Sequence, residues 1–194
     1  MRRITKAALG GLAGCALAIG GMQAASSETL LQQVFPGWLT DLDDNGPDLP
    51  FETTGAFDSA KGKLKVTETS DGKTTFSLEV RYIEPGFTDR TFGSHLHTDS
   101  CETYGPSLTG PHYQHRLGDL TSEVWFSLKP NDEGVAVDTT VVDFVPKDPD
   151  GNGVMSIVIH AKDTNPADGK AGDKEVCLPL DVSTTWAIPV IGTP

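Results

Sequence analysis

The chain has 194 residues and a net charge of −12, from 27 acidic and 15 basic residues. This length allows one domain with a hydrophobic core, together with a targeting segment and a tether. The acidic excess argues against nucleic acid or an anionic membrane surface as the partner. Many short β-branched runs, with 21 glycines and 13 prolines, predict an all-β body.

The first 25 residues have the pattern of an export signal. Arg2, Arg3 and Lys6 form a positive start, and an apolar stretch rich in Ala and Gly follows. Within it, Leu12-Ala-Gly-Cys15 resembles a bacterial lipobox, which predicts lipidation of Cys15. The alternative is ordinary cleavage near Ala24, which would release a soluble protein. In both cases the domain is expected outside the cytoplasm, and the segment is too short and Gly-rich for a lasting membrane span.

Residues 26–52 are predicted to be an acidic tether. Apolar residues at helical spacing could form one helical face, interrupted by Pro36; they are Leu30, Leu31, Val34, Phe35 and Trp38. Residues 41–52 also resemble a calcium loop that ends at Glu52. Pro47 and Pro50 do not suit such a loop, so a linker is the preferred interpretation.

From residue 53 to 182 short apolar runs alternate with turn signals, which predicts one β domain followed by a tail over 183–194. The expected strands are Lys63–Glu68, Thr75–Ile83, Arg90–His97, Glu123–Leu128, Val135–Val145, Met155–His160 and Glu175–Leu180. Ser70-Asp-Gly-Lys between the first two predicts a hairpin turn. About eight antiparallel strands at this spacing indicate a Greek-key sandwich or flattened barrel.

All five histidines lie in two short stretches and one strand: His95, His97, His112, His115 and His160. Imidazole is the commonest transition-metal ligand. Two histidines separated by one residue face the same side of a strand, so both can reach one ion. The clustering therefore predicts a metal site.

Two cysteines remain once Cys15 is assigned to the signal. Cys101 and Cys177 form an even pair in an exported chain, for which a disulfide is the default expectation. The alternative is a copper site with a cysteine ligand, which needs a free thiolate.

The contexts of these residues resemble the copper/zinc superoxide dismutase family over about residues 55–180. The matching landmarks are Gly93-Ser-His-Leu-His, Gly110-Pro-His, Gly118-Asp-Leu, Val158-Ile-His-Ala-Lys and Ala171-Gly-Asp-Lys-Glu-Val-Cys. The resemblance implies an eight-stranded Greek-key barrel that converts superoxide to dioxygen and hydrogen peroxide. It also implies a Cys101–Cys177 disulfide and four copper ligands, which are His95, His97, His112 and His160.

The sequence departs from the family after His112, where the zinc-binding loop is almost absent. Asp119 follows His112 by only seven positions. His112, His115 and Asp119 could hold a weak zinc, but structural zinc sites normally have four protein ligands. The chain therefore resembles the copper-only branch, in which an acidic side chain hydrogen-bonds the bridging histidine. Asp119 is the expected partner of His112.

Lys174 stands where the family places an arginine that guides the substrate. Lysine keeps the positive charge that would attract superoxide to an acidic domain, without the bidentate fork. In the mechanism implied by the resemblance, His112 passes a proton to the forming peroxide.

Two other functions fit parts of the pattern. The first is a copper-binding protein without dismutase activity, which the missing zinc loop and Lys174 motivate. The second is a cupin, because His95 and His97 followed by Glu102 resemble the cupin ligand string. A cupin does not explain the cysteine pair or the contexts of His112 and His160.

Overall fold

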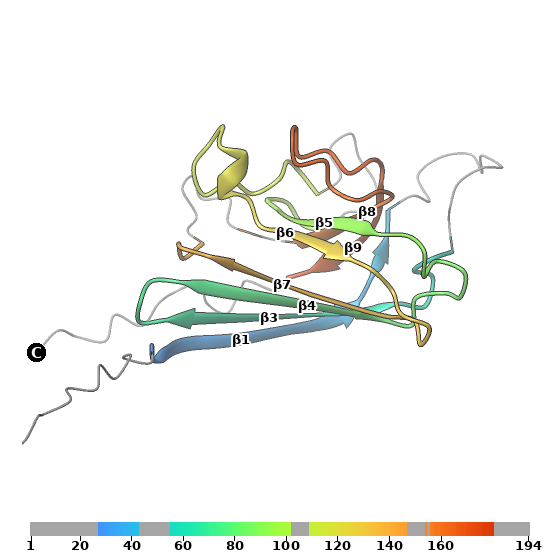
Figure 1. Ribbon diagram of the computed structural model, residues 1–194, viewed down its shortest axis with the longest axis horizontal. Coiled ribbons are helices and arrows are strands. Elements are labelled where there is room, and N and C mark those ends of the chain that lie inside the picture. The colour runs from blue at the N-terminus through green and yellow to red at the C-terminus, as the bar shows by residue number, and fades with distance from the viewer. Residues whose placement is uncertain (1–26, 43–54, 102–108, 147–153, 155, 181–194) are drawn as a thin grey trace, which may run out of the picture.

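The computed structural model describes residues 27–42, 55–101, 109–146, 154 and 156–180 as two antiparallel sheets packed face to face (Figure 1). The first sheet has the order β1-β3-β4-β7, and the second has the order β2-β9-β8-β5-β6. The strands are β1 (Thr29–Trp38), β2 (Thr40–Asp41), β3 (Lys61–Thr69), β4 (Thr74–Arg81), β5 (Phe92–His97), β6 (Trp125–Leu128), β7 (Val135–Val142), β8 (Ser156–His160) and β9 (Lys174–Pro179). The prediction of an all-β sandwich is confirmed.

The seven strands expected from short apolar runs between turn signals correspond to β3 through β9. The hairpin between β3 and β4 is also confirmed, and Gly72 takes the positive φ of 80° that its turn requires. Alternate side chains of these strands fill one core between the sheets, including Leu64 in β3, Leu78 in β4 and Phe126 in β6. The hydrophobic burial of this core is the main force that holds the two sheets together.

The tether prediction is wrong for residues 29–41. Instead of a helical face, these residues form β1, an edge strand that pairs antiparallel with β3, and β2, which pairs with β9. Pro36 lacks an N–H group, and proline is tolerated in a sheet at an edge strand. Phe35 points inward and packs against the core, while Val34 and Trp38 on the other face are exposed.

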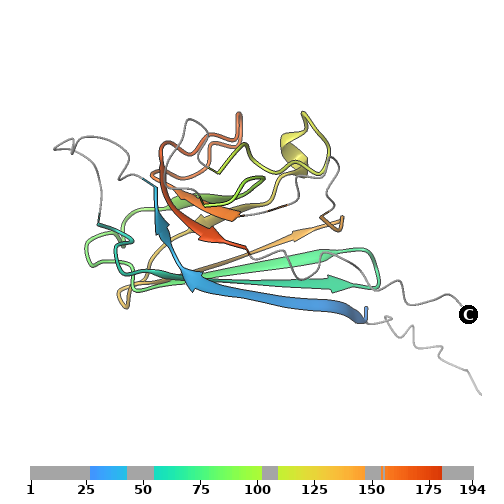
Figure 2. The ribbon, with the colours of Figure 1, turned by 180° about the vertical axis from the view of Figure 1, so that it is seen from behind.

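The chain thus passes from one sheet to the other between β1 and β2, as Figure 2 shows from behind. The signal with Cys15, the acidic stretch from residue 43 to Glu52, Glu102 and the C-terminal tail lie outside the described residues. Among the residues that are described, no helix has the length and apolar character needed to cross a membrane.

The outer face of the five-stranded sheet carries the residues of interest. In β5, Phe92 and Leu96 belong to the core, so His95 and His97 face the opposite side. This side is also buried, because the segments that follow β5 and β8 lie over it (Figure 1). The fold therefore places polar side chains in a covered layer outside the main core.

Candidate metal site

Four histidines converge on the outer face of the five-stranded sheet. His95 and His97 come from β5, His160 ends the neighbouring strand β8, and His112 forms an isolated β-bridge with His97. One ring nitrogen of each lies within 4.8 Å of the others, a spacing that fits one metal ion. The structure brings together four of the five histidines in the predicted site, and we call them the four-histidine cluster.

Each ring in the cluster is held through one nitrogen. His97 Nδ1 lies 3.0 Å from the carbonyl oxygen of Gly110 and 3.2 Å from Thr109 Oγ1. His160 Nδ1 lies 3.2 Å from the carbonyl oxygen of Gly172. Such contacts fix the orientation of a metal-binding imidazole and leave its second nitrogen for the metal.

The remaining two rings are held by side chains. His112 Nδ1 lies 2.9 Å from Glu123 Oε2, and His95 Nε2 lies 2.8 Å from Thr164 Oγ1. The opposite nitrogens of the cluster face one another, and His95 Nδ1 lies 3.2 Å from His160 Nε2. His97 Nε2 is buried and has no hydrogen-bond partner. An unpartnered buried nitrogen aimed at three other imidazoles is a position that a metal ion would satisfy.

The protonation of the rings also suits metal binding. Burial, with the neighbouring histidines, lowers the pKa of His95 and of His97 to about 2. Burial lowers the pKa of His160 to about 4, against the opposing effect of its bond to Gly172. These rings are neutral at pH 7, the form in which imidazole binds a metal. The donor set, four imidazole nitrogens, is one that copper favours.

Glu123, rather than Asp119, is the partner of His112. Its carboxylate also accepts hydrogen bonds from Gln114 Nε2 at 2.7 Å and Trp125 Nε1 at 2.6 Å. Burial raises the pKa of Glu123, but the bonds from His112, Gln114 and Trp125 outweigh it and lower the pKa below the usual value. Glu123 is therefore ionised and can accept a hydrogen bond from His112 Nδ1.

The expectation that Asp119 holds His112 is wrong. Asp119 caps the short 3₁₀ helix η1 (Leu120–Ser122), and its carboxylate accepts from Thr121 N at 2.9 Å. The same carboxylate pairs with Arg116 at 2.9 Å. Hydrogen bonds from Thr121 and Arg116 keep the pKa of Asp119 below its usual range. These local bonds direct the Asp119 carboxylate toward Thr121 and Arg116 instead of His112.

His115 is also placed apart from the cluster. Its ring stacks on Phe144 with a centroid distance of 4.3 Å, and its Nδ1 lies 3.5 Å from the hydroxyl of Tyr113. Within the described part of the chain, the metal-competent group contains neither His115 nor Asp119. The structure thus does not assemble the weak zinc site that the sequence allowed.

Lys174 lies beside the four-histidine cluster. Its Nζ donates to the carbonyl oxygen of Gly110 at 3.2 Å, the same oxygen that His97 contacts. Burial lowers the pKa of Lys174, and nearby Asp99 partly opposes this. The positive charge of Lys174 contributes to the lowered pKa of His97 and of His160.

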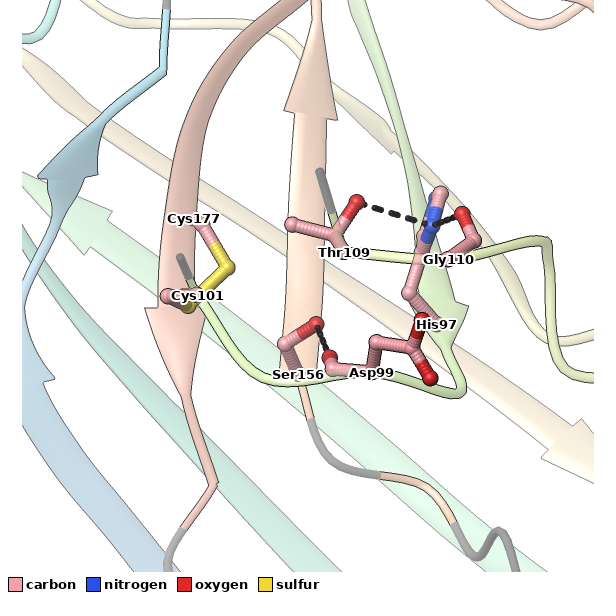
Figure 3. The surroundings of a disulfide bond; sticks show 7 residues. All are labelled: His97, Asp99, Cys101, Thr109, Gly110, Ser156 and Cys177. Carbon is pink, nitrogen blue, oxygen red and sulfur yellow. Dashed lines mark hydrogen bonds between the residues drawn. A yellow bond between two sulfur atoms is a disulfide. The ribbon is translucent and has the colours of Figure 1, made fainter. Parts of the chain in front are cut away.

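The predicted disulfide between Cys101 and Cys177 is confirmed, with a Cα–Cα distance of 5.7 Å (Figure 3). It links the segment that follows β5 to the middle of β9. The same segment is held to β8 by a hydrogen bond of 2.7 Å from Ser156 Oγ to the carbonyl oxygen of Asp99. Figure 3 also shows His97 between Thr109 and Gly110, which follow Cys101 along the chain.

No protein-family model matches the sequence, and no curated protein matches it. Among solved structures, the fold is similar to the crystal structure of the clock protein EA4, with a TM-score of 0.46 and 18% sequence identity. That match covers 66% of this chain and 88% of the other chain.

Proposed function

We propose that this protein is a copper-dependent superoxide dismutase that acts outside the cytoplasm. The observation that carries the proposal is the four-histidine cluster, in which one ring nitrogen of each histidine lies within 4.8 Å of the others. Its members are the histidines whose contexts resemble the dismutase family. Copper held by His95, His97, His112 and His160 would supply one-electron redox chemistry to superoxide.

His112 is the residue suited to move a proton. Its side chain is 23% exposed, whereas His95, His97 and His160 are all buried. Its Nδ1 is held by the Glu123 carboxylate, so its Nε2 would be the copper ligand, and it would hold a proton for the reduced oxygen product only when it is not bound to the metal. Glu123 would fix the ring orientation throughout, and we assign it the positioning role expected of Asp119.

Lys174 would attract superoxide to the cluster. The chain carries a net charge of −12, which repels an anion, so a nearby cation is needed to make the local potential favourable. Lys162, in the segment after β8, is exposed and can add to this potential.

Copper without zinc is the proposed metal content. His115 is stacked on Phe144 and the Asp119 carboxylate is bonded to Arg116, so neither is arranged as a zinc ligand beside His112. The Cys101–Cys177 disulfide is compatible with the proposed location, because disulfides persist in oxidising compartments. Lipidation of Cys15 remains part of the proposal.

The decisive experiment combines copper content with the rate of superoxide consumption. The purified protein is expected to bind one copper per chain and to reach full activity without zinc. His160→Ala and His95→Ala should lose copper and activity together, whereas His115→Ala should retain both. Stoichiometric copper without superoxide turnover would instead support a copper-binding protein, and retention of copper in either cluster variant would overturn the ligand assignment.

A further inference from the structure

Three rings of the four-histidine cluster each contact an oxygen atom that can only accept a hydrogen bond, and His97 also contacts the Thr109 hydroxyl. His97 and His160 contact the carbonyl oxygens of Gly110 and Gly172, and His112 contacts the carboxylate of Glu123. Each of these rings must therefore carry its proton on Nδ1. Their Nε2 lone pairs all face the centre of the cluster.

His95 differs in two respects. It is held through Nε2 instead of Nδ1, and its partner is the Thr164 hydroxyl, which can donate or accept. If the hydroxyl accepts, His95 carries its proton on Nε2 and its Nδ1 lone pair faces the cluster. If the hydroxyl donates, His95 carries its proton on Nδ1, which lies 3.2 Å from His160 Nε2 and can donate to it.

These two states have opposite consequences for a cation. With Nε2 protonated, four lone pairs converge, and the lone pairs of His95 Nδ1 and His160 Nε2 repel each other unless a cation lies between them. With Nδ1 protonated, a hydrogen bond joins His95 to His160 and removes both nitrogens from the ligand set. The orientation of the Thr164 hydroxyl group thus determines whether all four histidines, or only two of them, have a lone pair available for a cation.

We propose that Thr164 is a positioning residue that holds His95 Nε2 in either tautomer of the ring and reverses its hydrogen bond when metal binds. In the metal-free protein the Thr164 hydroxyl donates to His95 Nε2, and His95 Nδ1 donates to His160. On metal binding, Nδ1 loses its proton, Nε2 gains one, and His95 then donates to Thr164. His95 stays neutral and releases no net proton; this inference rests on the proposed metal site.

The segment that carries Thr164 is fixed against β5 and β6. Gly93 N donates to the carbonyl oxygen of Lys162 at 2.8 Å, and Asp163 Oδ1 accepts from Thr164 N and from Ser127 Oγ, each at 2.9 Å. A Cβ atom at Gly93 would collide with Thr164 Oγ1 and lie 2.8 Å from Thr164 N. Glycine at position 93 therefore permits the close approach that places the hydroxyl on His95.

The experiment compares three replacements of Thr164 in the full chain. Thr164→Ser keeps the hydroxyl and is the matched control. Thr164→Val keeps the shape but neither donates nor accepts. Thr164→Asp, ionised at pH 7, accepts only. The tautomer of His95 is read in the metal-free protein from its imidazole ¹⁵N chemical shifts, assigned by comparison with His95→Ala.

Wild type, Thr164→Ser and Thr164→Val should show His95 protonated on Nδ1, and Thr164→Asp should show it on Nε2. Copper and zinc affinities, measured by competition with chelators, should fall about 10- to 100-fold in Thr164→Val, the range typical for loss of a partner of a metal-binding histidine. They should match wild type in Thr164→Ser and equal or exceed it in Thr164→Asp.

A His95 ring that keeps one tautomer in wild type and in Thr164→Asp would overturn the inference, as would wild-type metal affinity in Thr164→Val. The outcome is separable from that of the proposed function. If wild type binds no copper, the proposed function fails, while the ¹⁵N shifts of the metal-free protein still decide whether the group at position 164 controls which nitrogen of His95 carries the proton.

Discussion

Glu123 accepts hydrogen bonds from His112, Gln114 and Trp125, and all three approach one carboxylate. Its side chain is almost fully buried, so water cannot replace a lost bond easily. Among the described residues, Glu123 is the hydrogen-bond partner of His112 Nδ1, and the second nitrogen of the ring faces the four-histidine cluster. The orientation of His112 should therefore depend on Glu123.

Replacing Glu123 by Gln should lower superoxide turnover about 10- to 100-fold, because the neutral amide binds His112 less strongly and orients it less well. Steady-state rates of the copper-loaded protein measure this effect. Asp119→Asn is the matched control, since Asp119 bonds Thr121 and Arg116 and not His112. A larger loss of activity in Asp119→Asn than in Glu123→Gln would contradict the assignment.

The alternation of side chains along a strand predicted that His95 and His97 share one face, and the resemblance to the dismutase family added His112 and His160. The sequence did not identify Glu123, since the path from residue 112 to residue 123 depends on the turn around η1. The spacing of Asp119 and Thr121 could have indicated this turn, because an Asp side chain commonly accepts a hydrogen bond from the backbone N–H two positions later. That bond removes Asp119 as the partner of His112.

Glu68 in β3 is a second residue whose environment changes its pKa and, through it, the stability of the fold. It faces inward and is 4% exposed, and burial raises its pKa above the usual value. The unfolded chain therefore releases this proton more easily than the folded chain, and Glu68 reduces the stability of the fold as the pH rises above about 4.5.

Glu68→Gln should accordingly raise the melting temperature at pH 7, and the gain should shrink as the pH falls toward 4.5 and stay small below it. Thermal unfolding followed by circular dichroism over pH 3.5 to 7 tests this dependence. Glu84, which is exposed, provides the control Glu84→Gln. A gain that is the same at every pH would show that the charge of Glu68 is not its cause.

At the scale of elements, β1 shows why strand patterns at an edge are hard to read from sequence. The apolar residues Leu31, Val34, Phe35 and Trp38 also fit helical spacing, and Pro36 suggests an interruption. The strand forms because β3 offers a partner along residues 61–69, a contact that no local pattern contains. β3 and β4 were predictable because burial on one face gives them strict alternation.

Phe35→Ala should lower the free energy of unfolding by about 3 kcal/mol, since the ring packs against the core from β1. Val34 precedes Phe35 in the same strand but is 49% exposed, so Val34→Ala should change the free energy of unfolding by less than about 0.5 kcal/mol. Urea unfolding of both variants makes the comparison. Equal small effects would indicate that residues 29–38 are a tether in solution.

At the scale of the whole molecule, the metal site is assembled from segments distant in sequence. Cys101 lies between His97 and His112, and Cys177 lies in β9, next to the strand that ends at His160. The disulfide spans a sequence separation of 76 residues. It therefore reduces the conformational entropy of the unfolded chain. It also anchors the segment that leads to His112.

Replacing both Cys101 and Cys177 by Ala should lower the free energy of unfolding by roughly 4 kcal/mol, the value that chain entropy gives for a loop of this length. Copper affinity should fall as well, because the segment carrying His112 loses its covalent anchor to β9. Urea unfolding and chelator competition measure the two effects, and reduced wild-type protein should behave like the double variant. Unchanged copper affinity in a destabilised double variant would show that hydrogen bonds such as Ser156 to Asp99 hold His112 in place without the disulfide.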